Sequence, residues 1–315
     1  MSNIPDALQF ELEKIKIVEC YDDKKLLNGG LVAQGGNGSI YKKGTKFPQG
    51  IPDSPLKYGE DSLIKVSSKF DPKSYNRVKS EMKCENGDGC DNDMLLEAII
   101  MKELNTLNLP YFVKFEDVCF SKKYGYLIQM ENLKNASSFT NVHYKLSREQ
   151  MLSILCQLTY ALKMANEQLF FVHSDLIGQN IMIQFGEREK ITLGDITIDN
   201  FGVTPVIIDF GYSRIQIGEN LRLVKITPTV IPDKFNPEEL FNGWIDLCKI
   251  YANPNFRKKI EDLYEVTIIH NISLKNILSE CTFKTSFYRV VPPFPKVKSP
   301  HDQLLKSKLF DEIKY

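Results

Sequence analysis

The chain has 315 residues, and its 40 Lys plus Arg balance its 40 Asp plus Glu, so its formal net charge at pH 7 is zero. Binding to long nucleic acids usually needs a basic excess, and a disordered chain combines high net charge with few apolar residues. Because 43 % of the residues are hydrophobic, we expect a globular chain that does not bind extended nucleic acid.

The first part of the chain has the pattern of short β-strands. A Gly-rich turn within residues 30–41 separates two β-type runs, and residues 61–66 predict a further strand. Residues 44–59 between them are rich in Pro and Gly and predict a loop. Residues 113–120 and 126–130 predict a pair of strands.

Two helices are indicated by periodicity and by capping residues. Apolar residues recur at helical spacing over 94–107, and Asp91 or Asp93 is a natural N-cap for that helix. Residues 147–150 have the Ser-x-x-Gln pattern of a capping box. They predict an apolar helix that continues to about Ala165.

The second part of the chain is expected to be mainly helical. Two short apolar runs, 181–183 and 203–210, predict strands separated by a long irregular piece. Helical patterns return after about residue 237, and the polar stretch 132–141 is the best candidate for a boundary. The chain as a whole is therefore expected to have an α+β fold.

Five motifs follow one another in an order that carries chemistry. They are the Gly-rich turn at 34–41, Lys65 in a strand, Glu97 in a helix, the run His-Ser-Asp-Leu-Ile-Gly-Gln-Asn at 173–180 and the run Ile-Ile-Asp-Phe-Gly at 207–211. Each motif alone has an ordinary structural explanation, such as a hairpin turn or a core strand. In this order and spacing they resemble the signature set of the protein kinases.

The resemblance extends over about residues 30–250 and implies the fold and reaction of that superfamily. The implied fold is bilobal, with a β-rich N-lobe at 1–132, a mainly helical C-lobe at 133–315 and ATP in the cleft between them. The implied reaction transfers the γ-phosphoryl group of ATP to a Ser or Thr hydroxyl of a protein substrate. We expect a monomer.

The resemblance also implies a nucleotide site. A Gly-rich turn lets backbone N–H groups approach phosphate oxygens without side chains between them. Lys65 would hold the α- and β-phosphates and would itself be held by Glu97; Glu103, the alternative partner, lies too close to Pro110 for the family pattern. The residues expected to bind the nucleotide are Gly35, Gly36, Gly38, Ile40, Leu63, Lys65, Met130, Glu131, Asn132 and Met182, with 130–133 as the hinge.

Three further residues are implied in catalysis and metal binding. Asp175 is expected to orient the attacking hydroxyl and accept its proton. Asn180 and Asp209 are expected to hold Mg²⁺ or Mn²⁺, because hard cations prefer oxygen ligands. His173 is expected to pack under Phe210 as a structural residue and not to carry protons.

Several positions depart from the usual kinase pattern. Ala33 stands at the first glycine of the loop, Ser174 replaces the arginine after His173, and Ile177 replaces the lysine two residues after Asp175. The missing arginine predicts activity that does not depend on phosphorylation of the activation segment. The missing lysine removes one positive charge near the γ-phosphate, which is expected to lower the rate unless another group compensates.

Other features resemble the haspin-like kinases. Asn180 and Asp209 stand 29 positions apart, and Ser213-Arg214 follows the Ile-Ile-Asp-Phe-Gly run at 207–211. Residues 301–305, His-Asp-Gln-Leu-Leu, have the pattern of a closing helix. Residues 227–233 are compatible with a degenerate peptide-docking segment or with a plain loop. Asp246 is compatible with the helix aspartate that braces the catalytic loop.

Two other functions share part of this pattern. Phosphotransferases that act on aminoglycosides or choline have a similar His-x-Asp run and also lack the lysine, although the Gly-rich loop and residues 110–114 favour a protein kinase. A pseudokinase that only binds partners is the other alternative. The presence of Lys65, Asp175, Asn180 and Asp209 argues against it, since a scaffold needs none of them.

Cysteine content and apolar runs indicate the compartment. Seven cysteines in so long a chain do not have the pattern of a disulfide framework. We therefore expect a reducing compartment, the cytoplasm or the nucleus. No signal-peptide pattern opens the sequence and no apolar stretch approaches the roughly 20 residues of a membrane helix, so no membrane association is expected.

Overall fold

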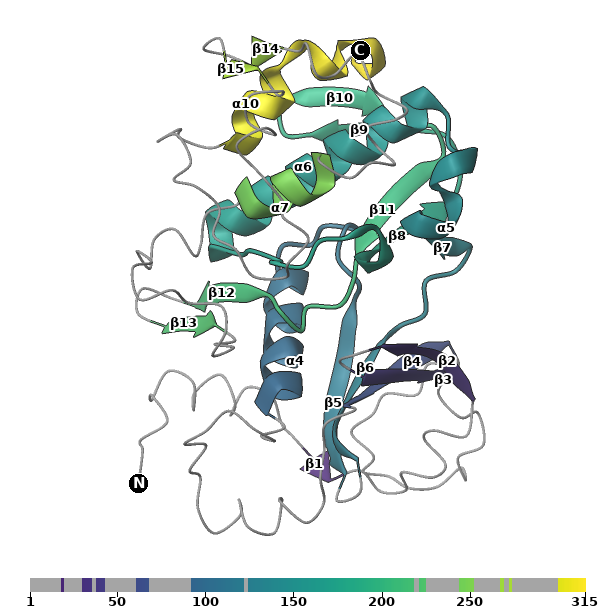
Figure 1. Ribbon diagram of the computed structural model, residues 1–315, viewed down its shortest axis with the longest axis vertical. Helices are drawn as coiled ribbons and strands as arrows, with labels where there is room; N and C mark the ends of the chain where they lie inside the picture. Colours follow the sequence, from purple (N-terminus) through teal and green to yellow (C-terminus); the bar gives the residue numbers. More distant parts are fainter. Residues whose placement is uncertain are drawn as a thin grey trace.

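A computed structural model describes eleven parts of the chain (Figure 1). The described residues are 18–19, 30–35, 38–42, 61–67, 92–121, 124–217, 221–224, 244–251, 267–268, 272–273 and 300–315. They form an α+β structure with one large sheet, several small sheets and one long helix, so the α+β part of the expected fold is confirmed. The expected loop at 44–59 and the docking segment at 227–233 lie outside the described residues.

The large sheet has six strands in the order β1-β5-β6-β4-β3-β2, and it lies in the lower half of Figure 1. Its strands are β1 (Val18–Glu19), β2 (Leu31–Gly35), β3 (Gly38–Lys42), β4 (Ser62–Ser67), β5 (Phe115–Ser121) and β6 (Gly125–Glu131). All neighbours are antiparallel except β1 and β5. The strands predicted after residue 30 are therefore confirmed.

The register of this sheet places several predicted site residues on one face. Ile40 of β3 pairs with Lys65 of β4, and Lys65 pairs with Ile128 of β6. Leu63 of β4, two residues before Lys65, pairs with Met130 of β6. Directly opposed residues lie on the same face, and a strand alternates faces at each residue. Ile40, Lys65, Leu63 and Met130 therefore share a face.

Helix α4 (Asn92–Asn105) packs against β5 and β6, as predicted for residues 94–107. Its apolar residues, such as Ile99 and Leu104, are buried in the main hydrophobic core. Asp93 lies inside the helix, so it is not the N-cap, because that residue precedes the first helical position. Asp91, the other candidate, lies outside the described residues.

Helix α6 (Arg148–Leu169) is the central element of the second part. Ser147 and Gln150 form the predicted capping box, in which each side chain bonds the backbone of the other residue. The helix ends at Phe170, whose φ of 50° is left-handed and directs the chain away. Most residues from Met151 to Ala165 of α6 are buried, because the elements around the helix cover this part of it.

The segment expected to be irregular is instead an ordered hairpin. Strands β8 (Ile181–Phe185) and β11 (Val203–Ile207) pair antiparallel as predicted, with β7 (Ala136–Ser138) beside β8. Between them the chain forms β9 (Lys190–Leu193) and β10 (Ile196–Asp199) around a turn in which Gly194 has φ +64°. Alternation over such short strands is a weak sequence signal, so this hairpin was missed.

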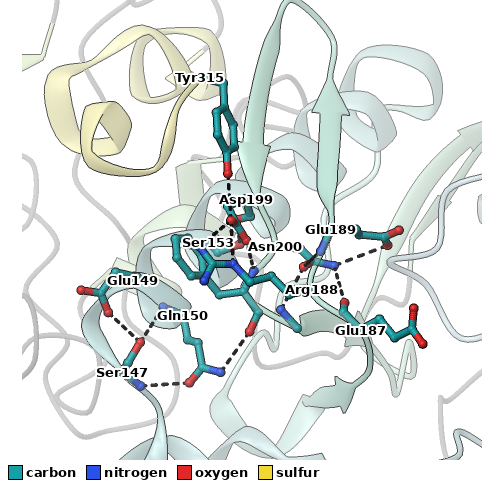
Figure 2. A network of polar contacts seen from close by, with 12 residues as sticks. Ser147, Glu149, Gln150, Ser153, Glu187, Arg188, Glu189, Asp199, Asn200 and Tyr315 are labelled. Carbon is teal, nitrogen blue, oxygen red and sulfur yellow. Dashed lines mark hydrogen bonds and ion pairs between the residues drawn. The ribbon is translucent and has the colours of Figure 1, made fainter.

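A polar network holds the hairpin against α6 and residue 315 (Figure 2). The Asp199 carboxylate accepts hydrogen bonds from Arg188 at 2.8 Å and from the Tyr315 hydroxyl at 2.9 Å. The Ser153 hydroxyl of α6 donates to the Asp199 carbonyl at 2.9 Å. Ile198 also bridges to Lys314. The hairpin is thus packed at the top of Figure 1, away from the large sheet.

The remaining elements are short helices and strands. They are α5 (Phe139–Val142), η1 (His143–Lys145), η2 (Gly178–Asn180), β12 (Arg214–Ile217), β13 (Leu221–Val224), α7 (Trp244–Tyr251), β14 (Thr267–Ile268), β15 (Ile272–Ser273), α10 (Pro300–Lys306) and η5 (Lys308–Ile313). The helical patterns expected after about residue 237 lie largely outside the described residues, so a mainly helical second part stays a prediction. The described residues after 133 combine helices with four small sheets.

Two expectations about the compartment can be compared with the structure. Among the described helices, none is both long and apolar enough to cross a membrane. Cys119 of β5 is disulfide-bonded, whereas the sequence predicted no disulfide framework. Cys156 of α6 is a free, buried thiol.

Candidate active site

The ammonium group of Lys65 joins two acidic residues from distant parts of the chain. Its Nζ lies 2.6 Å from Oε1 of Glu97 on α4 and 2.7 Å from Oδ1 of Asp209, which follows β11. Lys65 and Glu97 are only 4 % and 3 % exposed. Glu97, and not Glu103, is therefore the ion-pair partner of Lys65.

Lys65 and Asp209 stabilise each other's charge, whereas burial raises the pKa of Glu97 despite the nearby ammonium group. Burial lowers the pKa of Lys65, but the two carboxylates outweigh it and hold the pKa above its ordinary value. Burial raises the pKa of Asp209, and the Lys65 charge and hydrogen bond outweigh that effect, so the pKa of Asp209 is lowered. The ammonium and the Asp209 carboxylate are thus both charged at neutral pH.

The backbone around Asp209 is fixed by contacts on both sides. Ile207, at the end of β11, exchanges backbone hydrogen bonds with Tyr111 and Val113 at 2.8 and 3.1 Å. Asp209 has φ 61°, a left-handed conformation that is uncommon for residues other than glycine. The next amide, of Phe210, donates to Oε1 of Glu97 at 3.3 Å. Glu97 therefore orients both Lys65 and the turn that carries Asp209.

Asp175 and Asn180 lie together on the loop after Val172. The Asn180 side-chain amide donates to the Asp175 carbonyl at 2.8 Å and to its carboxylate at 3.2 Å. The Asn180 carbonyl accepts a hydrogen bond from Ile208 N at 3.0 Å, so this loop is tied to the residue that precedes Asp209. Since the Asn180 amide nitrogen is used internally, its side-chain oxygen is left as an acceptor.

Asp246 of α7 supports this loop through its carboxylate. Its carboxylate is 1 % exposed and accepts hydrogen bonds from His173 N at 2.6 Å and Ser174 N at 2.9 Å. Ser174 has φ 66°, a conformation that needs such support in a residue with a side chain. The bracing contact proposed from sequence for Asp246 is present.

His173 is a structural residue in this geometry. Its Nδ1 accepts a hydrogen bond from Asp175 N at 3.3 Å, and its Nε2 donates to the Ile208 carbonyl at 3.0 Å. Both contacts are satisfied by the neutral tautomer with hydrogen on Nε2, and burial lowers the pKa of His173. Its ring lies 5.6 Å from that of Phe210, whose ring also neighbours Phe171. The predicted packing is observed.

Gly38, at the end of the Gly-rich turn, is required by strand packing. A Cβ atom at this position would lie 2.4 Å from the Val66 carbonyl oxygen, which no side chain can tolerate without moving β3 from β4. Gly35 pairs directly with Gly38. Gly36 lies outside the described residues. Close packing of β3 on β4 thus requires a glycine at position 38, independently of the phosphate binding expected there.

Two backbone N–H groups of the expected hinge, those of Glu131 and Asn132, already make hydrogen bonds within the protein. Glu131 N donates to the Lys114 carbonyl at 3.0 Å, and its carboxylate accepts from Lys114 N at 2.7 Å. Asn132 N donates to the Asp61 carbonyl at 3.1 Å. The backbone N–H of Asn132 is therefore already paired within the protein.

Leu133, the last residue of the expected hinge, has a backbone N–H without a hydrogen-bond partner among the described residues, so it is the free donor at the hinge. One contact of the site was missed in the sequence. The Ser213 hydroxyl donates to the His173 carbonyl at 3.3 Å, joining the segment after Gly211 to the loop of Asp175.

Comparison with known proteins gives a distant and partial relationship. No model of a known protein family matches the chain. The human serine/threonine-protein kinase Nek10 is 26 % identical over 176 residues, which are 52 % of this chain and 13 % of Nek10. The uncharacterized protein ZK177.2 of Caenorhabditis elegans is 36 % identical over 66 residues, 20 % of this chain and 22 % of that protein. The matches thus span less than a quarter of either relative's length.

Proposed function

We propose that this chain is an ATP-dependent protein kinase that transfers the γ-phosphoryl group to a Ser or Thr hydroxyl of a protein. The observation that carries the proposal is the group of Lys65, Glu97 and Asp209, in which a buried Lys65–Glu97 pair meets the partly exposed Asp209 and joins three motifs separated by up to 144 positions in the chain. The partial similarity to a serine/threonine-protein kinase supports the same class.

The architecture proposed with this function is bilobal. The six-stranded sheet with α4 forms an N-lobe within residues 1–132, and the elements from 133 to 315 form a C-lobe. The hairpin β9–β10 accounts for the long separation of Asn180 from Asp209, which is the haspin-like feature of the sequence. We propose a haspin-like relationship on this feature and on Ser213-Arg214.

The proposed ATP site runs along the shared face of β3, β4 and β6. Glycines 35 and 38 lie at one end of this face, Lys65 lies in the middle, and Leu63 and Met130 lie at the hinge end. Ile40 pairs with Lys65 and, with Leu63 and Met182, would enclose the adenine. In this arrangement the Glu131 carbonyl and the free N–H of Leu133 would bind the adenine edge.

The donors present fit Mg²⁺ or Mn²⁺ bound together with nucleotide. The Asp209 carboxylate and the side-chain oxygen of Asn180 are the hard oxygen ligands such ions prefer. The described residues contain no cluster of three or more His, Cys, Asp or Glu that could form a complete protein cage. Mg²⁺ usually completes its shell with phosphate oxygens and water. When bound, the ion would neutralise charge on the phosphates.

Asp175 is proposed to orient the acceptor hydroxyl and take up its proton. Its carboxylate is held by the Asn180 amide at 3.2 Å, and its backbone N–H by His173. Positioning of this kind supplies much of the catalysis in phosphoryl transfer. Ile177, 41 % exposed beside Asp175, brings no charge to the γ-phosphate, and Lys65 is the cation proposed to bind the phosphates.

The test is an assay with γ-labelled ATP and Mg²⁺, with basic proteins, casein and small alcohols as acceptors. Wild type is compared with Asp175→Asn and Asp209→Asn, and with Asp195→Asn as a matched control at the exposed turn of the β9–β10 hairpin. We expect label on protein with wild type and the control, and none with the other two. Phosphatase treatment of the enzyme is expected to leave the rate unchanged.

Other outcomes of the same assay would overturn the proposal. Label on a small alcohol but on no protein would assign a small-molecule phosphotransferase. Nucleotide binding without transfer to any acceptor would assign a pseudokinase. Full activity of the Asp175 variant would remove that residue from the mechanism and the kinase assignment with it.

A further inference from the structure

Asn105 is the last residue of α4, and its side-chain amide binds the main chain on both sides of Lys114. Its Nδ2 donates a hydrogen bond to the Val113 carbonyl at 3.3 Å, and its Oδ1 accepts one from Phe115 N at 2.6 Å. An asparagine amide can serve both groups at once because it carries a donor and an acceptor. The side chain thus binds two main-chain groups that a neighbouring strand would otherwise bind.

The segment that Asn105 binds also holds the end of β11. Val113 N donates to the Ile207 carbonyl at 3.1 Å, and Ile207 N donates to the Tyr111 carbonyl at 2.8 Å. Tyr111 and Val113 are only 4 % and 2 % exposed. The N–H of Val113 is therefore bound to β11 and its carbonyl to α4. Through this one residue, Asn105 connects α4 with the strand that ends two residues before Asp209.

This connection bears on the two carboxylates that share the ammonium group of Lys65. Glu97 lies on α4, eight residues before Asn105, which is about 12 Å along a helix. Asp209 follows β11, so the distance between the two carboxylates depends on where α4 lies relative to β11. The ion pairs at Lys65 fix that relationship at one level of α4. Asn105 fixes it at the C-terminal end of the helix.

We infer that Asn105 is a positioning residue for the proposed phosphotransfer, and that its side-chain amide keeps α4 in the place where Glu97 and Asp209 can both bind Lys65. The inference rests on the proposed function. Asn105 lies outside the five motifs of the sequence and touches none of the three charged residues in the described contacts. Its effect is exerted through the backbone of Val113 and Phe115.

Two substitutions remove the amide and two others serve as controls. Asn105→Leu replaces it with an apolar group of comparable size, and Asn105→Ala removes it without adding a larger group. Thr106→Ala is the neighbouring control, because the exposed Thr106 hydroxyl donates at 2.6 Å to the Glu103 carbonyl in the same helical turn. Ser147→Ala is the control for a general loss of stability, because Ser147 caps α6 in another part of the chain.

The first readout is steady-state kinetics. For Asn105→Leu and Asn105→Ala we expect kcat to fall by about tenfold to a hundredfold, the range that a small misplacement of catalytic groups produces. The KM for ATP should change little, because positioning needed in the transition state is lost mainly from kcat. Thr106→Ala and Ser147→Ala should match the wild-type kcat. In the Glu97→Gln background, Asn105→Leu should add little further loss, since the carboxylate that it positions has been removed.

The second readout needs no activity. The Phe210 amide donates to Oε1 of Glu97, so its hydrogen–deuterium exchange reports whether Glu97 stays beside the turn of Asp209. This exchange should be faster by about tenfold in Asn105→Leu and Asn105→Ala, and unchanged in both controls. If the wild type transfers no phosphate, this measurement still tests the inference apart from the proposed function.

Two results would overturn the inference. One is unchanged exchange at Phe210 in either folded variant of Asn105. The other is a loss of kcat in Ser147→Ala equal to that in Asn105→Leu, because the effect would then follow from lower stability and not from the position of α4.

Discussion

Lys65 donates a hydrogen bond to Asp209 at 2.7 Å, although the two residues stand 144 positions apart in the chain. Lys65 lies on β4 of the large sheet, and Asp209 follows β11 of the three-stranded sheet β11-β8-β7. The same ammonium group binds Glu97 of α4. One cation therefore joins three elements, and its loss should affect both stability and ligand binding.

The substitution Lys65→Met should be strongly destabilising because it leaves the buried Glu97 carboxylate without its cation. Breaking a buried ion pair from one side costs about 3–5 kcal/mol. The double variant Lys65→Met/Glu97→Gln should recover part of that loss, since no unpaired buried charge remains. Urea unfolding of both variants measures the difference. Equal stability of the single and double variants would show that Glu97 is not held by Lys65.

Gly38→Ala should destabilise the hairpin of β2 and β3. The new Cβ atom would lie 2.4 Å from the Val66 carbonyl oxygen, so β3 and β4 must separate. Overpacking of this kind costs about 1–3 kcal/mol. Gly186→Ala is the control, because nothing lies within 4 Å of a Cβ there. Thermal unfolding should show a lower Tm for Gly38→Ala only; an equal Tm for both variants would contradict the close packing.

The stability of the protein should fall as the pH is lowered below about 6.5. Burial lowers the pKa of His301 from 6.5 to about 3, so the unfolded chain takes up a proton at this residue before the folded chain does. The contribution is fully present above pH 6.5 and is lost as the pH falls toward 3, at about 1.4 kcal/mol per pH unit for one histidine. His173, whose pKa is also lowered, acts in the same direction.

His301→Leu isolates this effect. Nε2 of His301 has no hydrogen-bond partner among the described residues, so the substitution should leave stability at pH 7 unchanged or raise it. Between pH 6.5 and 5 the unfolding free energy of the variant should fall less steeply than that of wild type. The difference in slope corresponds to the uptake of about one proton on unfolding. Denaturant unfolding at several pH values measures how the unfolding free energy of each protein depends on pH. Equal pH dependence in variant and wild type would show that His301 is not the group responsible.

Ser147→Ala should weaken the start of α6. The Ser147 hydroxyl accepts a hydrogen bond from Gln150 N at 3.2 Å, and Ser147 N donates to the Gln150 side chain at 3.0 Å. Loss of an N-cap side chain costs about 0.5–2 kcal/mol. Ser147→Asp retains a capping oxygen and should stay close to wild type. Unfolding free energies would contradict the capping role if both variants were equally destabilised.

Local patterns were sufficient for elements with strong periodicity or capping. The capping box of residues 147–150 predicted the start of α6 because both of its contacts lie within four residues. The pair β5–β6 was predicted because two apolar runs flank a short turn. The hairpin β9–β10 was missed, since its stability comes from contacts with Tyr315 and Ser153, far away in the chain.

The sequence by itself determined the α+β class and the order of the charged motifs, because strands, helix caps and glycine turns depend on neighbouring residues. Its resemblance to the kinase pattern also favoured Glu97 over Glu103 as the acidic partner of Lys65. Only the tertiary structure showed the contact between Lys65 and Glu97, showed that the Asn132 amide is already paired, and brought Arg214 beside Val172, next to the loop held by Asp246. These relationships depend on how α4, β11 and α7 pack around the sheet and α6, and pairing over such distances leaves no local signal in the chain.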